Sequence, residues 1–374
     1  MSELSQTIVF NQGDDGYDTF RIPAIVTAAN GDLLAFAEAR KNSDRDNGDI
    51  DLVLKRSTDG GTTWSGLQMV GELGDHTYGN PTPIVAGDGV IHLLTTSNVG
   101  ADGKQRIREG ASKDIRRVHY QKSADHGVTW RAPVEITAQA THAGAVWRWY
   151  ATGPGHGIQL RRGPHAGRLI APCNHSDHTT PADDPQEATN CAHVLYSDDA
   201  GATWHVGGML PTNGKTIRPW ESSAVELTDG RVHVNARNQP IGAYPRVGAY
   251  SDDGGESFGA VTHAAGLIES RGGVQGALLR YSAADAGDAG NRILFSNPAS
   301  LEARQRMTVR SSFDETQSWN RGRVIWPGPA GYSDMTKLPD GAIGLLYENG
   351  DTKYSQRLTF ARFTVEWLDA KTAD

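Results

Sequence analysis

Three arginines occupy matching places beside short β-rich runs of this chain. Arg21 opens the run RIPAIV, Arg237 closes VHVNA, and Arg304 comes just before MTVRSS. Unpaired guanidinium groups repel one another, so a cluster of them requires an anionic partner. Each offers a planar fork of donors to a carboxylate, through charge-assisted hydrogen bonds of about 1.5–3 kcal/mol. Taken singly, each fits an ordinary surface salt bridge, but together they predict a site for a ligand carboxylate, with Arg40 orienting a neighbour or joining the same pocket.

A tyrosine and a glutamate open two further runs, YSDMTKL at Tyr332 and ESSAVEL at Glu221. A phenol with a pKa of about 10 needs a base before it can act as a nucleophile at neutral pH. An uncharged phenol also suits a reacting carbon that already bears a carboxylate, because an Asp or Glu nucleophile would approach against like charge. The two side chains therefore predict a nucleophile, Tyr332, and its base, Glu221.

The acidic segment NSDRDNGD supplies a candidate general acid. Asp46 lies within this loop, where a mobile carboxylic acid could reach a leaving oxygen. A solvated loop carboxylate is the alternative interpretation, and Asp44, Asp49 and Asp51 are rivals for the role. Asp49 and Asp51 run into the strand IDLVLK, which makes them poorer choices for a mobile acid.

One pattern, Ser-x-Asp-x-Gly-x-x-Trp, recurs along the chain and marks an internal repeat. The copies are STDGGTTW at 57–64, SADHGVTW at 123–130, SDDAGATW at 197–204, and the variants SDDGGESF at 251–258 and SSFDETQSW ending at Trp319. Each follows a β-rich run and carries hairpin-turn chemistry, in which Ser and Asp side chains hold backbone N–H groups and Gly accepts positive φ. Successive copies are 54 to 74 residues apart, enough for roughly four strands each.

Two strands joined by a short glycine turn precede each copy, as in PTPIVA-GDG-VIHLLT. First strands are expected to begin near Arg21, Asn80, Tyr150, Glu221, Gly273 and Tyr332. These six starts predict an all-β protein, a six-bladed β-propeller of four-stranded antiparallel blades, as one catalytic domain over residues 1–374. The last blade lacks a copy of the repeat, so the N-terminal TIVF segment is expected to pair into it and close the ring.

Chain direction then places the candidate residues on one rim. In an antiparallel blade, the start of strand one, the end of strand two and the start of strand three lie at the same edge. The repeated turns follow strand three and therefore lie on the opposite rim. This arrangement of strand ends brings seven side chains to one face: Arg21, Arg40, Asp46, Glu221, Arg237, Arg304 and Tyr332.

Longer segments carry a family resemblance, and they extend over nearly the whole chain. They are FRIP at 20–23, EAR at 38–40, DNGDIDLVLKRSTDGG from Asp46, ATGPGHGIQL at 151–160 and LLYENG at 345–350. With the repeated Asp boxes, these segments resemble the bacterial sialidase (neuraminidase) family of exo-α-sialidases. The sequence departs from the family pattern modestly, with Phe258 ending the fourth box and Thr316 replacing glycine in the fifth.

The resemblance implies a role for each candidate residue. It places the family's arginine triad on Arg21, Arg237 and Arg304, its acid/base on Asp46, its activating glutamate on Glu221, its nucleophile on Tyr332, and the second arginine of the first blade on Arg40. Asn80 stands where some members carry an acid that touches the sugar, so it is expected to contact the substrate.

The resemblance also implies an activity, the hydrolysis of terminal sialic acid from glycoproteins, glycolipids and oligosaccharides. Configuration would be retained through a tyrosyl-linked intermediate. Trans-sialidase, intramolecular trans-sialidase and a glycosidase for a deaminated nonulosonic acid are open alternatives. A propeller that binds sialic acid without cleaving it is a further one, although it would need no nucleophile and base.

The composition excludes several other classes. Hydrophobic residues at 37% and nine Trp in 374 residues are enough to bury a core. A formal net charge of −8 disfavours nucleic acid and anionic membrane surfaces, and no apolar run is long enough for membrane insertion. A monomer is expected, cytoplasmic for the chain as it stands and secreted or periplasmic if a leader has been removed.

Neither a metal nor another cofactor is expected. The run CNHSDH at 173–178 contains zinc-ligand types, but residues in immediate succession rarely converge on one ion. Cys173 and Cys191 are expected to flank one loop on neighbouring strands as free thiols, a disulfide being sterically possible. GPGHG at 153–157 predicts a backbone turn beneath the pocket, because no phosphate-loop Lys-Ser/Thr follows it.

Overall fold

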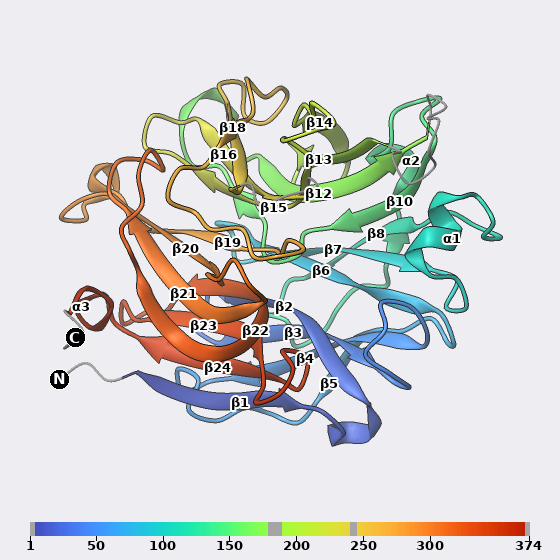
Figure 1. The fold of residues 1–374 in the computed structure, drawn as a ribbon, viewed down its shortest axis with the longest axis horizontal. Coiled ribbons are helices and arrows are strands. Elements are labelled where there is room, and N and C mark those ends of the chain that lie inside the picture. The colour runs from blue at the N-terminus through green and yellow to red at the C-terminus, as the bar shows by residue number, and fades with distance from the viewer. Residues whose placement is uncertain (1–3, 179–188, 240–244, 371–374) are drawn as a thin grey trace.

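The computed structural model describes residues 4–178, 189–239 and 245–370, which fold almost entirely as antiparallel β-sheet (Figure 1). The all-β prediction is confirmed. The strands form groups of four that pair in chain order through hairpins. Within these described ranges, three short α-helices accompany them: α1 (Lys104–Arg108), α2 (Thr137–Ala140) and α3 (Val365–Asp369).

The first groups follow the predicted order of strands. They are β2 (Thr19–Thr27), β3 (Leu33–Arg40), β4 (Ile50–Ser57) and β5 (Gln68–Gly71), then β6 (Thr77–Val85), β7 (Ile91–Asn98), β8 (Arg117–Ser123) and β9 (Val134–Glu135). Next come β10 (Trp147–Thr152), β12 (Leu169–Asp177), β13 (Thr189–Ser197) and β14 (His205–Met209), with β11 (Ile158–Gln159) beside β12, and then β15 (Pro219–Glu226), β16 (Val232–Asn238), β17 (Val247–Ser251) and β18 (Thr262–His263).

One long strand, β22 (Arg323–Lys337), belongs to two groups. Its first part follows β19 (Ala277–Ser282), β20 (Arg292–Pro298) and β21 (Gln305–Ser312), and its second part pairs with β23 (Ile343–Asn349). The last group is completed by β24 (Arg357–Phe363) and β1 (Ser5–Asn11). Thr7 of β1 pairs with Phe360 of β24, so the predicted pairing of the TIVF segment with the final sheet is confirmed.

The groups surround a common centre, with β2, β6, β15, β19 and β22 nearest to it in Figure 1. Neighbouring first strands contact one another, β2 against β6 and β22, and β19 against β15 and β22. Buried apolar side chains fill the space between groups, as where Phe20 and Ile25 of β2 cluster with Phe360 of β24. Every residue of β3 is buried, which explains why LLAFA is continuously apolar instead of alternating.

Two predicted strand starts are wrong, and a third strand is interrupted. Gly273 precedes β19, which begins at Ala277, because Gly272 and Gly273 take positive φ of 79° and 70° in a turn. Tyr332 lies inside β22, because the outer strand of one group runs on without a turn into the first strand of the next. In the third group, the GPGHG segment separates β10 from β11.

The repeated turns share one hydrogen-bond pattern. In the first copy, Gly61 N donates to Ser57 Oγ at 2.8 Å and Thr63 N donates to Asp59 Oδ1 at 2.9 Å. The same two bonds recur in the other four copies. Thr316 takes the glycine position in the last copy with φ of 73°, so the departure from glycine leaves the turn intact.

Replacing Gly61 by alanine is expected to lower the free energy of unfolding by about 2–4 kcal/mol. Gly61 has φ of +92°, and a Cβ there would lie 2.0 Å from Phe360 Cε1 in the packed core. Chemical denaturation followed by tryptophan fluorescence would measure the change. Gly66→Ala is the control, since nothing lies within 4 Å of its Cβ position. Equal midpoints for the two variants would contradict the tight packing of this turn.

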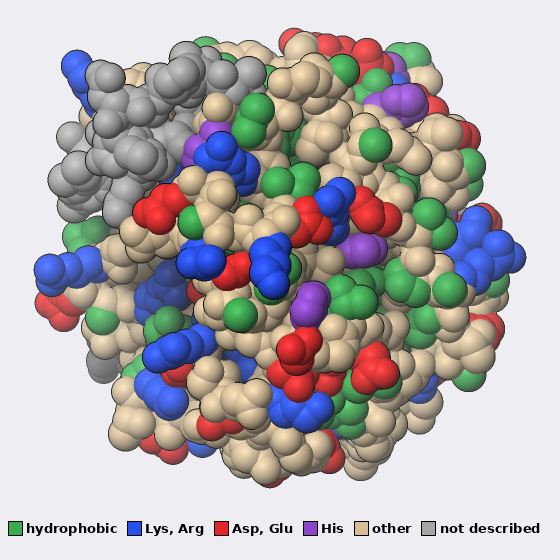
Figure 2. All heavy atoms as spheres, turned by 90° about the vertical axis from the view of Figure 1, so that its right-hand side faces the viewer, with side chains coloured by type: hydrophobic (Ala, Val, Ile, Leu, Met, Phe, Trp, Pro, Cys, Tyr) green, Lys and Arg blue, Asp and Glu red, His purple; other side chains and the backbone are tan. Residues whose placement is uncertain are grey.

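The surface mixes charges of both signs. Figure 2 shows basic and acidic side chains interspersed over one side of the molecule. Among the described residues, no helix has the length and apolar character needed to cross a membrane.

Candidate active site

One cavity of about 240 Å³ brings together all the candidate residues that the sequence indicated. Its lining includes Arg21, Arg40, Asp46, Asn80, Glu221, Arg237, Arg304 and Tyr332. These residues come from four of the strand groups and from the loops that enter β4 and β21. The predicted convergence on one rim is therefore what the structure has.

Irregular strand pairing aims these side chains into the cavity. The register shifts between Arg21 and Ala24 in β2, Gly79 and Thr82 in β6, Pro219 and Ser222 in β15, and Ala330 and Ser333 in β22. Such bulges bend a strand locally and redirect its side chains. At two of them Ile22 and Asn80 take left-handed φ of 57° and 55°, a conformation that costs about 1–3 kcal/mol outside glycine. Backbone strain of this kind often occurs at functional sites.

Tyr332 and Glu221 form the buried centre of the cavity. Tyr332 Oη donates a short hydrogen bond to Glu221 Oε1. Arg237 Nη1 donates to Glu221 Oε2 at 2.7 Å and lies 3.4 Å from Tyr332 Oη. Burial and the charge of Glu221 raise the pKa of the Tyr332 phenol well above its usual value, and the nearby arginines oppose that shift. Burial alone would raise the pKa of Glu221, but Arg237 and the bond from Tyr332 hold it below its usual range, so this carboxylate is ionised.

Arg21 is fixed from behind by Glu348. Arg21 Nε and Nη2 donate to the two Glu348 oxygens at 3.0 and 3.1 Å. Glu348 is fully buried and also accepts the backbone N–H groups of Ile22 and Tyr332 at 3.1 and 3.0 Å. Gly331 is required beside it, because a Cβ there would lie 2.1 Å from Glu348 Oε2. The two-pronged ion pair holds the guanidinium rigid and leaves Nη1 to face the cavity.

Asp46 sits at the mouth of the cavity between two arginines. Its Oδ1 accepts from Arg40 Nη1 at 2.9 Å and from Arg21 Nη1 at 3.2 Å, and its side chain is 72% exposed. Arg40 is itself anchored by Glu38, whose Oε2 lies 2.7 Å from Arg40 Nη2. Partial desolvation opposes the shift, but Arg40 and Arg21 lower the pKa of Asp46 to about 2. Arg40 therefore does both things that the sequence left open, since it lines the pocket and orients Asp46.

A glycine turn orients the other two arginines of the triad. Arg237 Nη2 donates to the Gly272 carbonyl at 2.8 Å. Arg304 Nε and Nη2 donate to the Gly273 carbonyl at 3.1 and 2.8 Å. Gly273 cannot be larger, because a Cβ there would lie 2.4 Å from Arg237 Nε. Among the described residues Arg304 has no carboxylate partner, so its charge faces the cavity uncompensated.

Asn80 presents a hydrogen-bond donor where a carboxylate would present an acceptor. Its Oδ1 lies 2.7 Å from Arg116 Nη2, which can only donate, and it also accepts from Thr96 Oγ1 at 3.3 Å. Its backbone N–H donates to Glu38 Oε1 at 3.0 Å. The amide Nδ2 is therefore the group that Asn80 has left to offer a ligand.

Sequence reasoning missed several residues that complete the cavity. They are Glu38, Lys104, Arg116, Trp149, Trp220 and Tyr354 in the lining, with Glu348 behind it. Two of these could have been found, because Glu38 and Glu348 lie near the ends of second strands, in phase with Arg40 and Arg237. Trp149 is only 7% exposed, so it is packed as well as part of the lining.

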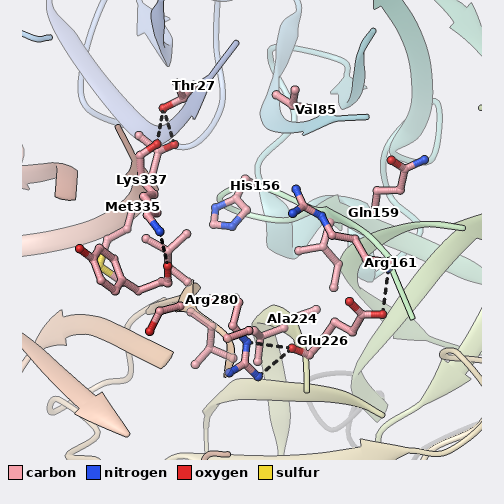
Figure 3. A pocket seen from close by; sticks show the side chains of 18 of the residues that line it. Thr27, Val85, His156, Gln159, Arg161, Ala224, Glu226, Arg280, Met335 and Lys337 are labelled. Carbon is pink, nitrogen blue, oxygen red and sulfur yellow. Dashed lines mark hydrogen bonds between the residues drawn. The ribbon is translucent and has the colours of Figure 1, made fainter. Parts of the chain in front are cut away.

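A second cavity, of about 540 Å³, lies farther along the same first strands (Figure 3). Apolar side chains such as Ala224 and Met335 line it together with charged groups, of which Glu226 accepts from Arg162 at 2.7 Å. His156 of the GPGHG segment reaches it, and His156 Nδ1 lies 2.7 Å from Asp334 Oδ1. Asp334 follows Tyr332 by two residues on β22, so this turn lies beneath the first cavity. None of the candidate residues lines the larger cavity.

The two cysteines are buried free thiols on the neighbouring strands β12 and β13. The register places Cys173 opposite His193 and Cys191 opposite His175, so the thiols are not paired across the ladder. The loop predicted to lie between them falls outside the described residues. Within the described part of the chain, no three His, Cys, Asp or Glu side chains gather as metal ligands would.

The fold and the cavity define a class, an all-β protein with repeated Ser-Asp turns and a polar cavity lined by several arginines. Residues 31–345 match the family model of the BNR repeat-like domain. The chain is 35% identical over 373 residues to the sialidase of Micromonospora viridifaciens, and 33% identical over 384 aligned residues to the exo-alpha-sialidase of Aspergillus fumigatus. The alignments cover 95% and 94% of this chain, and 53% and 86% of those relatives. The chain belongs to the sialidase family and spans about half the length of the Micromonospora relative.

Solved structures agree with the fold. The Hadza microbial sialidase Hz136 superimposes with a TM-score of 0.81 at 24% identity, covering 97% of this chain and 69% of that one. The intramolecular trans-sialidase of Ruminococcus gnavus, in complex with oseltamivir carboxylate, gives a TM-score of 0.75 at 19% identity and covers 97% and 98% of the two chains. At these identities the likeness concerns the fold.

Proposed function

We propose that this chain is an exo-α-sialidase that hydrolyses terminal sialic acid from glycoconjugates with retention of configuration. The observation that carries the proposal is the buried Tyr332–Glu221 pair, held in one cavity with three arginines. A fluorogenic α-sialoside would test it, with the released sugar followed by NMR from the first turnover. Free sugar released first as the α-anomer supports the proposal. A 2,7-anhydro product, transfer to an added acceptor, or binding without cleavage would each replace it with one of the alternatives.

In the proposed mechanism the three arginines bind the substrate carboxylate. Arg304 has no carboxylate partner among the described residues, and Arg21 Nη1 can exchange its bond to Asp46 for one to the incoming anion. Arg237 contacts both Glu221 and Tyr332, so a carboxylate bound to it lies next to the nucleophile. The anomeric carbon, which bears this carboxylate, then lies over Tyr332 Oη.

The chemical steps follow from the groups around Tyr332. Tyr332 Oη transfers its proton to Glu221 and bonds to the anomeric carbon as the bond to the leaving oxygen breaks. Asp46 gives that oxygen a proton. Water then attacks the same carbon, Asp46 accepts the proton of the water, and the tyrosine leaves and regains its proton from Glu221. Two displacements retain the configuration.

Asp46 must gain a proton for this role, and its contacts explain how. Although burial opposes the shift, Arg40 and Arg21 lower its pKa to about 2, so it is ionised at neutral pH. A substrate carboxylate bound to Arg21 removes one of those cations from Asp46 and adds a nearby negative charge. Both changes raise the pKa of Asp46 toward the range of a working general acid.

Asp46→Ala is expected to slow natural glycosides by about 10²–10⁴-fold and an activated aryl glycoside far less. An alkoxide leaving group needs the proton, whereas a nitrophenolate does not. Steady-state kinetics on sialyllactose and on a nitrophenyl sialoside would measure the contrast. Asp49→Ala is the matched control, because Asp49 pairs with Lys41 outside the cavity. Equal slowing of both substrates would remove Asp46 from the role.

We also infer that the chain is one six-bladed β-propeller. The antiparallel groups of four, the contacts between successive first strands, and the pairing of β1 with β24 support a closed ring. The contribution of both chain ends to the last group supports a single domain.

A further inference from the structure

Lys104 is a pocket residue to which the proposed mechanism gives no task. It opens α1, in the segment between β7 and β8, and it lines the cavity with Glu221 and Arg237. Its Nζ lies 4.2 Å from the ring centre of Trp220 and 5.3 Å from that of Trp149. Within the described residues its ammonium group has no carboxylate in ion-pair range, so these two rings are its main contacts.

Cations cover the tryptophans of this wall. Arg116 Cζ lies 4.3 Å from the ring centre of Trp149, and the two indoles are only 7% and 2% exposed, packed with Ile107 of α1. Little bare aromatic surface is left for a methyl group. The groups that face the cavity here, the Lys104 ammonium, Arg116 and Asn80 Nδ2, are all hydrogen-bond donors.

The geometry of the sugar says which substituents meet this wall. In a nonulosonate ring the carboxylate-bearing carbon, C2, lies directly across from C5. With the carboxylate on the three arginines and C2 over Tyr332, the C5 substituent points away from the arginine side. The wall of Lys104, Trp149 and Trp220 has no task in the proposed mechanism, and Lys104 gives it a hydrogen-bond donor.

We propose that Lys104 is a specificity-determining residue that donates a hydrogen bond to an oxygen-terminated C5 substituent, a hydroxyl or an N-glycolyl group, in preference to N-acetyl. The inference rests on the proposed function, because it uses the carboxylate position assigned there. N-acetyl and N-glycolyl groups share an amide carbonyl and differ at the terminus, where the acetyl methyl would desolvate the ammonium without accepting a bond from it.

Lys104 changes its charge state close to neutral pH. Burial lowers its pKa to about 7, with Glu221 opposing the shift and Arg237 and Arg108 adding to it. Asp46 also faces it and favours the charged form, and Arg116 covers the neighbouring indole. The charged form predominates below this pKa, so the preference for an oxygen-terminated substituent is strongest there and declines as the pH rises.

Binding of 2,3-dehydro nonulosonates that differ only at C5, as hydroxyl, N-glycolyl or N-acetyl, tests the inference without requiring turnover. Calorimetry should give a Kd ratio that favours the oxygen-terminated ligands in the wild type. Lys104→Met should reduce that ratio by about tenfold or more, and Lys104→Arg should keep part of it. Lys113→Met, an exposed lysine on the same segment, is the control and should leave the ratio unchanged.

A pH series separates recognition from a merely structural role. The wild-type ratio should fall as the pH is raised from 6 to 8, whereas Lys104→Arg should hold its ratio across the series, because arginine stays charged. An unchanged ratio in Lys104→Met, or equal weakening of all three ligands, would overturn the inference. Because the readout is binding, a wild type that binds these ligands with the expected ratio but cleaves no sialoside would contradict the proposed function alone.

Discussion

Tyr332→Phe is expected to lower kcat on an aryl sialoside by about 10²–10⁴-fold, while a carboxylate-bearing inhibitor still binds. The phenol is the only hydroxyl that contacts Glu221 among the described residues, and Arg237 bridges the pair. Phenylalanine keeps the ring but removes the atom that would bond to the anomeric carbon. Burial holds the pKa of the phenol high, so the reaction requires Glu221 to take the proton as the bond forms.

A covalent adduct makes this prediction direct. A 2,3-difluorinated sialic acid slows the second displacement, so the wild type should gain the mass of the sugar on the peptide that contains Tyr332. Tyr354→Phe is a matched control, since Tyr354 lines the same cavity and contacts Arg304 but lacks a carboxylate beside its hydroxyl. An adduct on another peptide, or a first product with inverted configuration, would contradict a tyrosine nucleophile.

The sequence was sufficient to predict most of the strands and the convergence of the candidate residues, because both depend on local patterns. The hydrogen bonds of each Ser-x-Asp-x-Gly turn lie within seven residues, so each copy of the pattern predicts a hairpin by itself. With the hairpins placed, chain direction alone decides which strand ends share a rim. Arg21 and Tyr332, 311 positions apart in the chain, could thus be assigned to one rim from the sequence alone.

What the sequence did not reveal depends on contacts across groups or on backbone detail. Its strand position could have placed Glu348 at this rim, but its pairing with Arg21 of the first group is a contact that no local spacing encodes. The unbroken course of β22 through Tyr332 could not be predicted, because bulges are set by packing on both sides of a strand. Lys104 was missed because a charged residue in a connecting segment looks like solvent-exposed surface until the segment folds over two tryptophans.

Arg304 offers the most direct test of whether the three arginines bind the substrate carboxylate. Arg304→Ala should raise the Kd of a 2,3-dehydro sialic acid inhibitor by about 30–1000-fold, equivalent to about 2–4 kcal/mol. The test is clean because Arg304 has no ion-pair partner in the described chain, so its removal leaves no buried carboxylate uncompensated. Arg237→Ala should raise the Kd of the same inhibitor further, because it also removes the partner that lies 2.7 Å from Glu221.

An analogue that lacks the carboxylate distinguishes a loss of carboxylate binding from general damage to the pocket. Against such an analogue, Arg304→Ala should bind about as well as the wild type, because the deleted group had nothing to neutralise. Arg304→Lys should fall between, since an ammonium keeps the charge but loses the fork of donors that the Gly273 carbonyl orients. Arg321→Ala, an exposed arginine outside the cavity lining, controls for the loss of one positive charge. Equal weakening of both ligands in Arg304→Ala would show that this guanidinium supports the pocket and does not bind the carboxylate.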